Sequence, residues 1–379
     1  MEMFNIVGTK KLRCGYTTGT CAAGAAKAAA VLLLTHTPPK TVCITTPKGH
    51  KLELAVQNPT LVDGVAQCAI VKDSGDDPDI TNGILVLARV SATASEITID
   101  GGEGVGRVTR EGLECPVGAA AINRVPRSMI TAAVREAAEQ CGYNGGMAVE
   151  IIIPKGAELA HKTYNPRLGI VGGISVLGTS GIVEPMSEQA LIDSIKVEMN
   201  MLKADGAQII AVTPGNYGEE YLQNTLHVST QSAVKCSNFI GAVLDYAVVL
   251  GFSGILLVGH LGKFVKLAGG VFQTHSQYAD CRMEVLAAHS TVAGGNQALA
   301  RDIMQCITTD EAWEKIISAG LDTEVTESLL QKIEYHAKMR TGSALKIGAV
   351  VFTNKYGTLG ITSTAQELIG EITEFYGGK

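Results

Sequence analysis

The chain has 379 residues, of which 46% are hydrophobic and 18% are charged, and its formal net charge is -6. This length predicts two domains, and the composition excludes a disordered chain. The acidic balance argues against a nucleic-acid partner, because such proteins usually carry a basic face. The nine cysteines form no C-x-x-C pair and no Cys/His cluster at zinc spacing, which predicts reduced thiols.

Neither a leader nor a membrane span is predicted. The first residues, MEMFNIVGTKKLR, lack the apolar region of a signal peptide. The longest apolar stretches, 22–34 and 247–258, are interrupted and shorter than the roughly 20 residues that a spanning helix needs. We therefore expect a cytoplasmic protein without a membrane partner.

The first predicted helix follows a turn rich in threonine, in the stretch RCGYTTGTCAAGAAKAAAVLLL at 13–34. Threonines cap helices, and the amides at a helix start attract anions. A P-loop requires G-x-x-x-x-G-K-[ST]; Gly19 and Gly24 have that separation, but Ala25 and Ala26 follow, so the match fails. The alternative is that the alanines merely allow close helix packing. The residues predicted to bind an anionic ligand are Thr17, Thr18, Gly19 and Thr20.

Short β-branched runs separated by turn residues fill 41–153, which predicts strands. A helix is expected over 128–140, after Pro126 and before Gly142. With the alanine-rich helix, these elements predict a two-layer α+β domain. The Gly-rich apolar stretch at 168–186 is interpreted as the crossing between domains, with bounds of 1–180 and 181–379.

The segment ITIDGGEGVGRVT at 97–109 spells D-x-G-x-G-x-G from Asp100 to Gly106, the fingerprint of a common S-adenosylmethionine fold. That motif requires a helix directly afterwards and an acidic residue about 20 positions on, and the sequence predicts neither. The context therefore argues against a cofactor site. We expect a glycine hairpin in which Gly104 lets a ligand approach, with Arg107 nearby, or else an ordinary hairpin.

The segment KDSGDDPDIT at 72–81 carries four aspartates. Clustered carboxylates bind a hard metal ion or act as a base, whereas in turns they cap backbone groups. The spacing of an EF-hand is absent. Asp76 is the candidate for a ligand contact, and Asp77 is the candidate for a base.

Helices alternate with strands at 207–213, 254–260 and 347–353 in the second half, which predicts a doubly wound parallel sheet. Ligands bind such sheets at the carboxyl ends of the strands. The residues predicted to line this edge are Thr213, Gly215, Asn216, Gly259, His260, Gly262 and Lys263.

Several long motifs, in order along the chain, resemble the cobalt-precorrin-5B C1-methyltransferases of anaerobic cobalamin biosynthesis. They are GYTTGTCAAGAAKAA, KDSGDDPDIT, GGEGVGRVT, AAINRVPRSMI, YNPRLGIVGGISVLGTSGIVEPMS, TPGNYG, GHLGKFVKLAGGVFQTHS and ADCRMEVLAAH. The resemblance implies methylation of C1 of a cobalt tetrapyrrole by S-adenosylmethionine, giving cobalt-precorrin-6A. It also implies a first domain like the second domain of ribosomal protein S5, followed by a Rossmann-like domain.

The resemblance assigns roles to the residues above. S-adenosylmethionine would occupy the second domain, and cobalt would arrive inside the substrate, so no protein-bound metal is expected. Asp77 and His260 are candidates for a base. Cys14 departs from the small hydroxyl or aliphatic residue expected in its motif. The arginines proposed to bind substrate carboxylates are Arg13, Arg107, Arg124 and Arg127.

Two other classes of function stay open from the residues. A small-molecule kinase would use the threonine turn for phosphates, and a non-catalytic corrinoid carrier would bind the macrocycle without turnover. The many alanines and glycines favour self-association as a homodimer.

Overall fold

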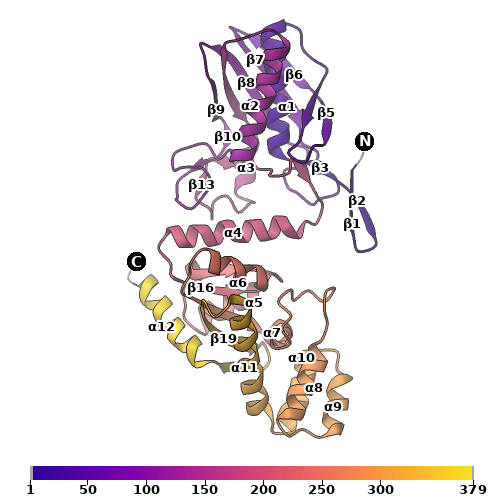
Figure 1. The fold of residues 1–379 in the computed structure, drawn as a ribbon, viewed down its shortest axis with the longest axis vertical. Helices are drawn as coiled ribbons and strands as arrows, with labels where there is room; N and C mark the ends of the chain where they lie inside the picture. The colour runs from indigo at the N-terminus through magenta and orange to yellow at the C-terminus, as the bar shows by residue number, and fades with distance from the viewer. Residues whose placement is uncertain (1–2, 378–379) are drawn as a thin grey trace. The chain divides into compact units, whose positions relative to one another are not determined.

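The computed structural model describes residues 3–377 and separates the chain into two compact units, Met1–Glu188 and Gln189–Lys379 (Figure 1). The boundary falls at Glu188 rather than at residue 180 for a physical reason. Strand β15 (Ile182–Val183) pairs antiparallel with β3 (Gly15–Tyr16), which holds this segment in the first unit. Each unit has its own hydrophobic core.

The first unit is built on a five-stranded sheet in the order β6-β7-β8-β12-β9. Its pairs are antiparallel, except that β12 and β9 run parallel. The strands are β6 (Gln57–Val62), β7 (Val65–Val71), β8 (Leu85–Thr93), β12 (Gly146–Ile152) and β9 (Ile97–Gly101). Helices α1 (Thr18–Thr35) and α2 (Arg124–Gln140) pack together, and α1 lies against β7 and β8 (Figure 1). This arrangement is the predicted two-layer α+β architecture.

Helix α1 is the centre of this unit. Its alanines are fully buried, and a Cβ at Gly24 would lie 2.7 Å from Leu54. By length and composition α1 is apolar enough to span a membrane, but 78% of it is buried inside the unit. The alanines therefore keep the helix slim enough to fit between the sheet and α2.

Small ribbons and one short helix complete the first unit. Strand β10 (Gly104–Val105) pairs parallel with β14 (Gly173–Ile174), and the other ribbons are antiparallel. The remaining elements are β1 (Phe4–Val7), β2 (Lys10–Arg13), β4 (Thr41–Thr45), β5 (Lys51–Ala55), β11 (Arg107–Val108), β13 (Ile170–Val171) and α3 (Gly156–Ala160).

The second unit is built on a five-stranded sheet in the order β17-β16-β18-β19-β20, which is 2-1-3-4-5 in order of appearance along the chain. The first four strands are parallel, and β20 returns antiparallel to β19. The predicted parallel sheet is thereby confirmed for four strands. The strands are β16 (Ile209–Thr213), β17 (Ala233–Lys235), β18 (Gly254–His260), β19 (Lys346–Thr353) and β20 (Gly357–Ile361).

Helices cover both faces of this sheet, because alternate residues of each strand enter two separate cores. Helices α5 (Asn216–Asn224) and α12 (Ser363–Gly377) pack on one face. The helices that contribute to the core of the other face are α4 (Glu188–Ala204), α6 (Ile240–Val249), α7 (Leu261–Ala268), α8 (Arg282–Val292), α9 (Gln297–Met304), α10 (Thr309–Ser318) and α11 (Asp322–Thr341).

Candidate functional site

The carboxyl edge of the second unit's sheet has the topology of a ligand site. From β16 the chain continues to β17 on one side, and from β18 it continues to β19 on the other. Ligands of doubly wound sheets bind where the strand order reverses in this way. The structure therefore brings together the residues that follow β16 with those that surround the end of β18, as the sequence predicted.

His260 is the last residue of β18 and caps α7. Its Nδ1 accepts a hydrogen bond from the Gly262 amide at 3.1 Å, so the neutral ring carries its proton on Nε2. That Nε2 lies 4.0 Å from Oδ1 of Asp310. Burial lowers the pKa of His260 below its usual range, and the nearby Asp310 carboxylate partly opposes the shift. The ring is accordingly a neutral hydrogen-bond donor at neutral pH.

Two lysines of α7 have different roles. Lys266 is 3% exposed, and its Nζ donates to the carbonyl oxygens of Thr274 at 3.0 Å and Ala279 at 2.8 Å. Lys263 lies nearer the start of the helix and donates to the Ser237 carbonyl at 3.3 Å. Burial lowers the pKa of Lys263. Lys266 therefore holds the loop after α7, while Lys263 places a cation beside the carboxyl edge.

The end of β16 carries a polar atom that the protein leaves unsatisfied. Thr213 is fully buried, and its Oγ1 has no hydrogen-bond partner among residues 3–377. A Cβ at Gly215 would meet nothing within 4 Å. Asn216 opens α5, and its Oδ1 accepts from Lys235 Nζ at 2.9 Å. This turn thus combines open space with a buried hydroxyl.

Gly259 has a packing role rather than the predicted ligand role. A Cβ at this position would lie 2.1 Å from the ring of Phe264. Glycine is required there because α7 folds back and places that aromatic ring against the strand.

The structure corrects the interpretation of the threonine turn before α1. Thr17 Oγ1 accepts from the Thr20 amide at 3.3 Å, and Thr20 Oγ1 donates to the Gly181 carbonyl at 2.7 Å. The Gly19 amide donates to the Leu177 carbonyl at 2.9 Å. Thr18 is 7% exposed and Thr20 is fully buried. The segment 177–181 therefore covers this helix end, and the donors of Gly19 and Thr20 bind groups of the protein itself.

Gly104 is likewise a packing residue rather than a ligand contact. Its φ is +72°, and a Cβ there would lie 1.8 Å from the Ile153 carbonyl oxygen. A Cβ at Gly156 or at Gly173 would likewise overlap the carbonyl oxygen of Gly104. These glycines let three backbone segments meet. The predicted hairpin does not form, because β9, β10 and β11 pair with β12, β14 and β13 and not with one another.

The arginines at 13 and 107 are paired within the first unit. Arg107 forms a bidentate pair with Asp100 at 2.8 and 3.0 Å, which lowers the pKa of that carboxyl. Arg13 forms a bidentate pair with Asp73 at 2.6 and 2.8 Å, with the same effect on the Asp73 pKa. Their charges are thus locally neutralised.

The other aspartates of the acidic segment also bind protein groups. Asp76 Oδ2 accepts from the Arg13 amide at 2.6 Å, and Asp77 Oδ1 accepts from the Met186 amide at 3.0 Å. Asp79 pairs with the buried Lys72. Residues 3–377 contain no group of three or more His, Cys, Asp or Glu arranged to hold a metal. Asp73 and Asp79 also accept from the Gly75 and Thr81 amides within the turn, the capping role of the turn interpretation.

A hollow of about 480 Å³ in the first unit brings two of the predicted arginines together. The Arg127 guanidinium donates to the carbonyls of Ile122, Ile99 and Ala120, at 2.8, 2.9 and 3.3 Å. The Arg124 side chain is 88% exposed and lies 3.6 Å from Glu114. The lining residues are Glu114, Cys115, Pro116, Ile122, Arg124 and Arg127.

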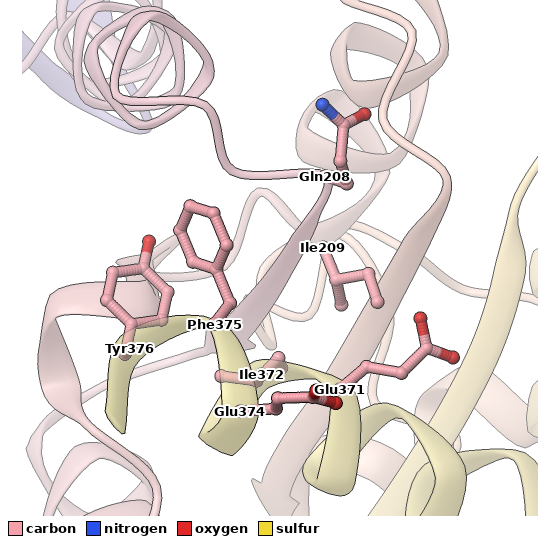
Figure 2. A pocket seen from close by; sticks show the side chains of 7 residues that line it. All are labelled: Gln208, Ile209, Glu371, Ile372, Glu374, Phe375 and Tyr376. Carbon is pink, nitrogen blue, oxygen red and sulfur yellow. The ribbon is translucent and has the colours of Figure 1, made fainter. Parts of the chain in front are cut away.

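A second hollow, of about 380 Å³, lies in the second unit at the amino end of β16 and the last turns of α12 (Figure 2). This is the opposite edge of the sheet from the switch point, and nothing in the sequence indicated it. Its lining residues are Gln208, Ile209, Glu371, Ile372, Glu374, Phe375 and Tyr376.

Asp310 is the site residue that sequence reasoning missed. It lies at the start of α10, fifty positions after His260. Thr308 caps α10 by accepting from the Glu311 amide at 3.2 Å, so the T-x-x-E pattern gives the helix start. No local pattern indicates that this helix start faces the end of β18.

Comparisons with known proteins point to one family. The family model described as CbiD matches residues 6–185, and the one described as CbiD, C-terminal domain, matches residues 273–363. A protein of Ruminiclostridium cellulolyticum named cobalt-precorrin-5B C(1)-methyltransferase is 47% identical over 93% of this chain and 92% of its own. A protein of the same name from Alkaliphilus metalliredigens is 44% identical over 97% of both chains.

A crystal structure of a cobalamin biosynthesis protein (cbiD) from Archaeoglobus fulgidus is 28% identical, over 73% of this chain and 86% of its own, with a TM-score of 0.39. The sequence matches extend over nearly the whole chain and at this identity leave no doubt of common descent. The chain belongs to the CbiD family, that of the cobalt-precorrin-5B C(1)-methyltransferases.

Proposed function

We propose that this chain transfers the methyl group of S-adenosylmethionine to C1 of cobalt-precorrin-5B, giving cobalt-precorrin-6A. The observation that carries the proposal is the 47% identity, over 93% of the chain, to a relative that bears the enzyme's name. Cobalt is part of the substrate in this proposal, and no metal is assigned to the protein. A cytoplasmic location and a homodimer stay predictions.

The methyl donor is assigned to the carboxyl edge of the second unit. This assignment is supported by the switch point, the open space at Gly215 and the orphaned hydroxyl of Thr213. Bound there, S-adenosylmethionine supplies an already activated methyl group. The residues proposed to hold it are Thr213, Gly215, Asn216, His260, Gly262 and Lys263.

We also propose a specific fold type for each unit of this mixed α/β protein. The parallel strands and the helices on both faces support a Rossmann-like second unit, with the strand order 2-1-3-4-5. The two-layer α+β arrangement supports the likeness of the first unit to the second domain of ribosomal protein S5.

The substrate is a macrocycle with several carboxylates, and the hollow beside Arg124 and Arg127 is proposed to bind one of them. The carbonyl contacts of Arg127 fix its positive charge in place, and the exposed Arg124 presents its guanidinium to solvent. Arginine suits this task because its planar fork pairs with a carboxylate through two hydrogen bonds. Arg13 and Arg107 are not proposed for this role, since each forms a bidentate pair with an aspartate, whereas the exposed Arg124 has only a 3.6 Å contact to Glu114.

Holding the two reactants in line is the protein's main task, and positioning of this kind is worth about 7–11 kcal/mol of a barrier. His260 is proposed to orient rather than to act as the base, because its Nδ1 is occupied by the Gly262 amide. Asp77 stays the candidate for a base; one oxygen of its carboxylate binds the Met186 amide.

The reaction is tested by incubating the protein with cobalt-precorrin-5B and S-adenosylmethionine. We expect S-adenosylhomocysteine and a tetrapyrrole heavier by one CH2 group in the mass spectrum. A coloured complex without S-adenosylhomocysteine would instead indicate a corrinoid carrier. Calorimetric binding of Mg-ATP, with none of S-adenosylmethionine, would indicate a kinase.

A further inference from the structure

Asp310 carries a carboxylate oxygen that the protein leaves without a partner. Its Oδ1 is buried and makes no hydrogen bond to any of the residues 3–377, although 38% of the side chain is exposed. A buried carboxylate oxygen without a donor is costly, and such atoms in native proteins normally have one. The atom therefore indicates a donor that comes from outside the chain.

The nearest charged or titratable partner of this oxygen is Nε2 of His260, at 4.0 Å. That distance is too long for a hydrogen bond. Because the Gly262 amide donates to Nδ1, the Nε2 of the neutral His260 ring carries the proton and is a hydrogen-bond donor. A hydrogen-bond donor and an acceptor thus lie 4.0 Å apart without a hydrogen bond between them.

A hydroxyl group offers both of the functions that these two atoms need. Its oxygen accepts one hydrogen bond while its hydrogen donates another. An oxygen at about 2.8 Å from each of two atoms that are 4.0 Å apart has favourable contacts to both. An ammonium would offer only donors, and a carboxylate would be repelled by Asp310.

A second orphaned atom lies at the same sheet edge. Oγ1 of the fully buried Thr213, at the end of the neighbouring strand β16, also has no partner within residues 3–377. Two unsatisfied polar atoms near the switch point favour a ligand with several polar groups over a simple ion.

We infer that Asp310 and His260 together bind a ribose hydroxyl of a nucleoside cosubstrate. The His260 Nε2–H donates to the hydroxyl oxygen, and the hydroxyl donates to Oδ1 of Asp310. This inference rests on the proposed function, in which the cosubstrate is S-adenosylmethionine with its two ribose hydroxyls. Asp310 then takes the place of the acidic residue that binds ribose in other doubly wound folds, although it comes from a helix start far along the chain.

The test measures binding of S-adenosylmethionine and of its 2′-deoxy and 3′-deoxy analogues by calorimetry. The wild-type chain should bind one deoxy analogue on the order of tenfold to a hundredfold more weakly than S-adenosylmethionine. Asp310→Ala should bind S-adenosylmethionine more weakly than the wild type does, by a similar factor. This variant should bind that deoxy analogue as tightly as it binds S-adenosylmethionine. The matched control is Asp302→Ala, which removes an exposed carboxylate of the neighbouring α9 and should bind as the wild type does.

The outcomes separate the two proposals. If the wild type binds S-adenosylmethionine and both analogues alike, the ribose assignment is overturned while the proposed function stands. The ribose assignment is also overturned, and the proposed function stands, if Asp310→Ala prefers S-adenosylmethionine over the deoxy analogue as strongly as the wild type does. If the wild type binds no S-adenosylmethionine at all, the proposed function fails and the inference fails with it. The analogue series on the wild type decides the question even if Asp310→Ala does not fold.

Discussion

At the residue scale, single atoms decide which sequence motifs are sites and which are packing devices. Gly104 and Gly215 both belong to glycine motifs that follow a strand. A Cβ at Gly104 would overlap a backbone carbonyl, whereas a Cβ at Gly215 would meet empty space. Only the second position leaves room for a ligand.

Replacing Gly104 by alanine should destabilise the first unit strongly. The new Cβ would lie 1.8 Å from the Ile153 carbonyl oxygen, and alanine disfavours the φ of +72°. We expect a loss of at least about 2 kcal/mol in the free energy of unfolding, measured by urea denaturation. Gly118→Ala is the control, because its φ is +86° but no atom lies within 4 Å. Equal losses in the two variants would contradict the steric argument.

At the element scale, the two units use the hydrogen-bond donors at their helix starts differently. At the start of α1, the amides of Thr17 and Gly19 donate to carbonyls of the protein's own segment 177–181. The start of α7 is capped by the imidazole of His260, a group that titrates near neutral pH. The cap depends on an unprotonated Nδ1, so the start of α7 is sensitive to acid.

This cap predicts a pH dependence of stability. Burial lowers the pKa of His260 in the folded chain, so the unfolded chain binds its proton more readily. The contribution to stability is complete above the unfolded pKa of about 6.5 and is lost as the pH falls through the lower folded value. His260→Asn keeps a capping side chain that does not titrate, and its unfolding midpoint in urea should fall less from pH 7.5 to 5.5 than that of the wild type.

The control for this prediction is His36→Asn. His36 is exposed and ends α1 with a φ of 57°, a conformation that asparagine tolerates well. This variant should show the same acid sensitivity of the second unit as the wild type. An unchanged acid sensitivity in His260→Asn would refute the role of the cap.

At the scale of the whole molecule, the chain forms two units, and each unit has hydrophobic cores of its own. The core of the first unit is formed by α1, α2 and the mixed sheet, and the cores of the second unit lie on the two faces of the parallel sheet. Units that bury their own apolar surfaces are expected to fold alone.

Two fragments, 1–186 and 187–379, should therefore each fold, a cut that leaves α4 whole. Each fragment should give a cooperative urea transition by circular dichroism. The fragment 187–379 should also bind S-adenosylmethionine in the calorimeter, because all residues proposed to hold it lie there. A fragment that stays unfolded, or binding found only with 1–186, would contradict this division.

The sequence by itself determined the family, the two-part organisation and the edge of the parallel sheet where ligands are expected. Long motifs and strand–helix alternation are local patterns, and strand ends at a parallel sheet meet at one edge whatever the rest of the fold does. Only the tertiary structure decided that the threonine turn is covered, that Gly104 and Gly259 serve packing, and that Asp310 faces His260. The contacts of the threonine turn, Gly104 and Asp310 join residues from about 50 to 160 positions apart, for which the sequence offers no local signal.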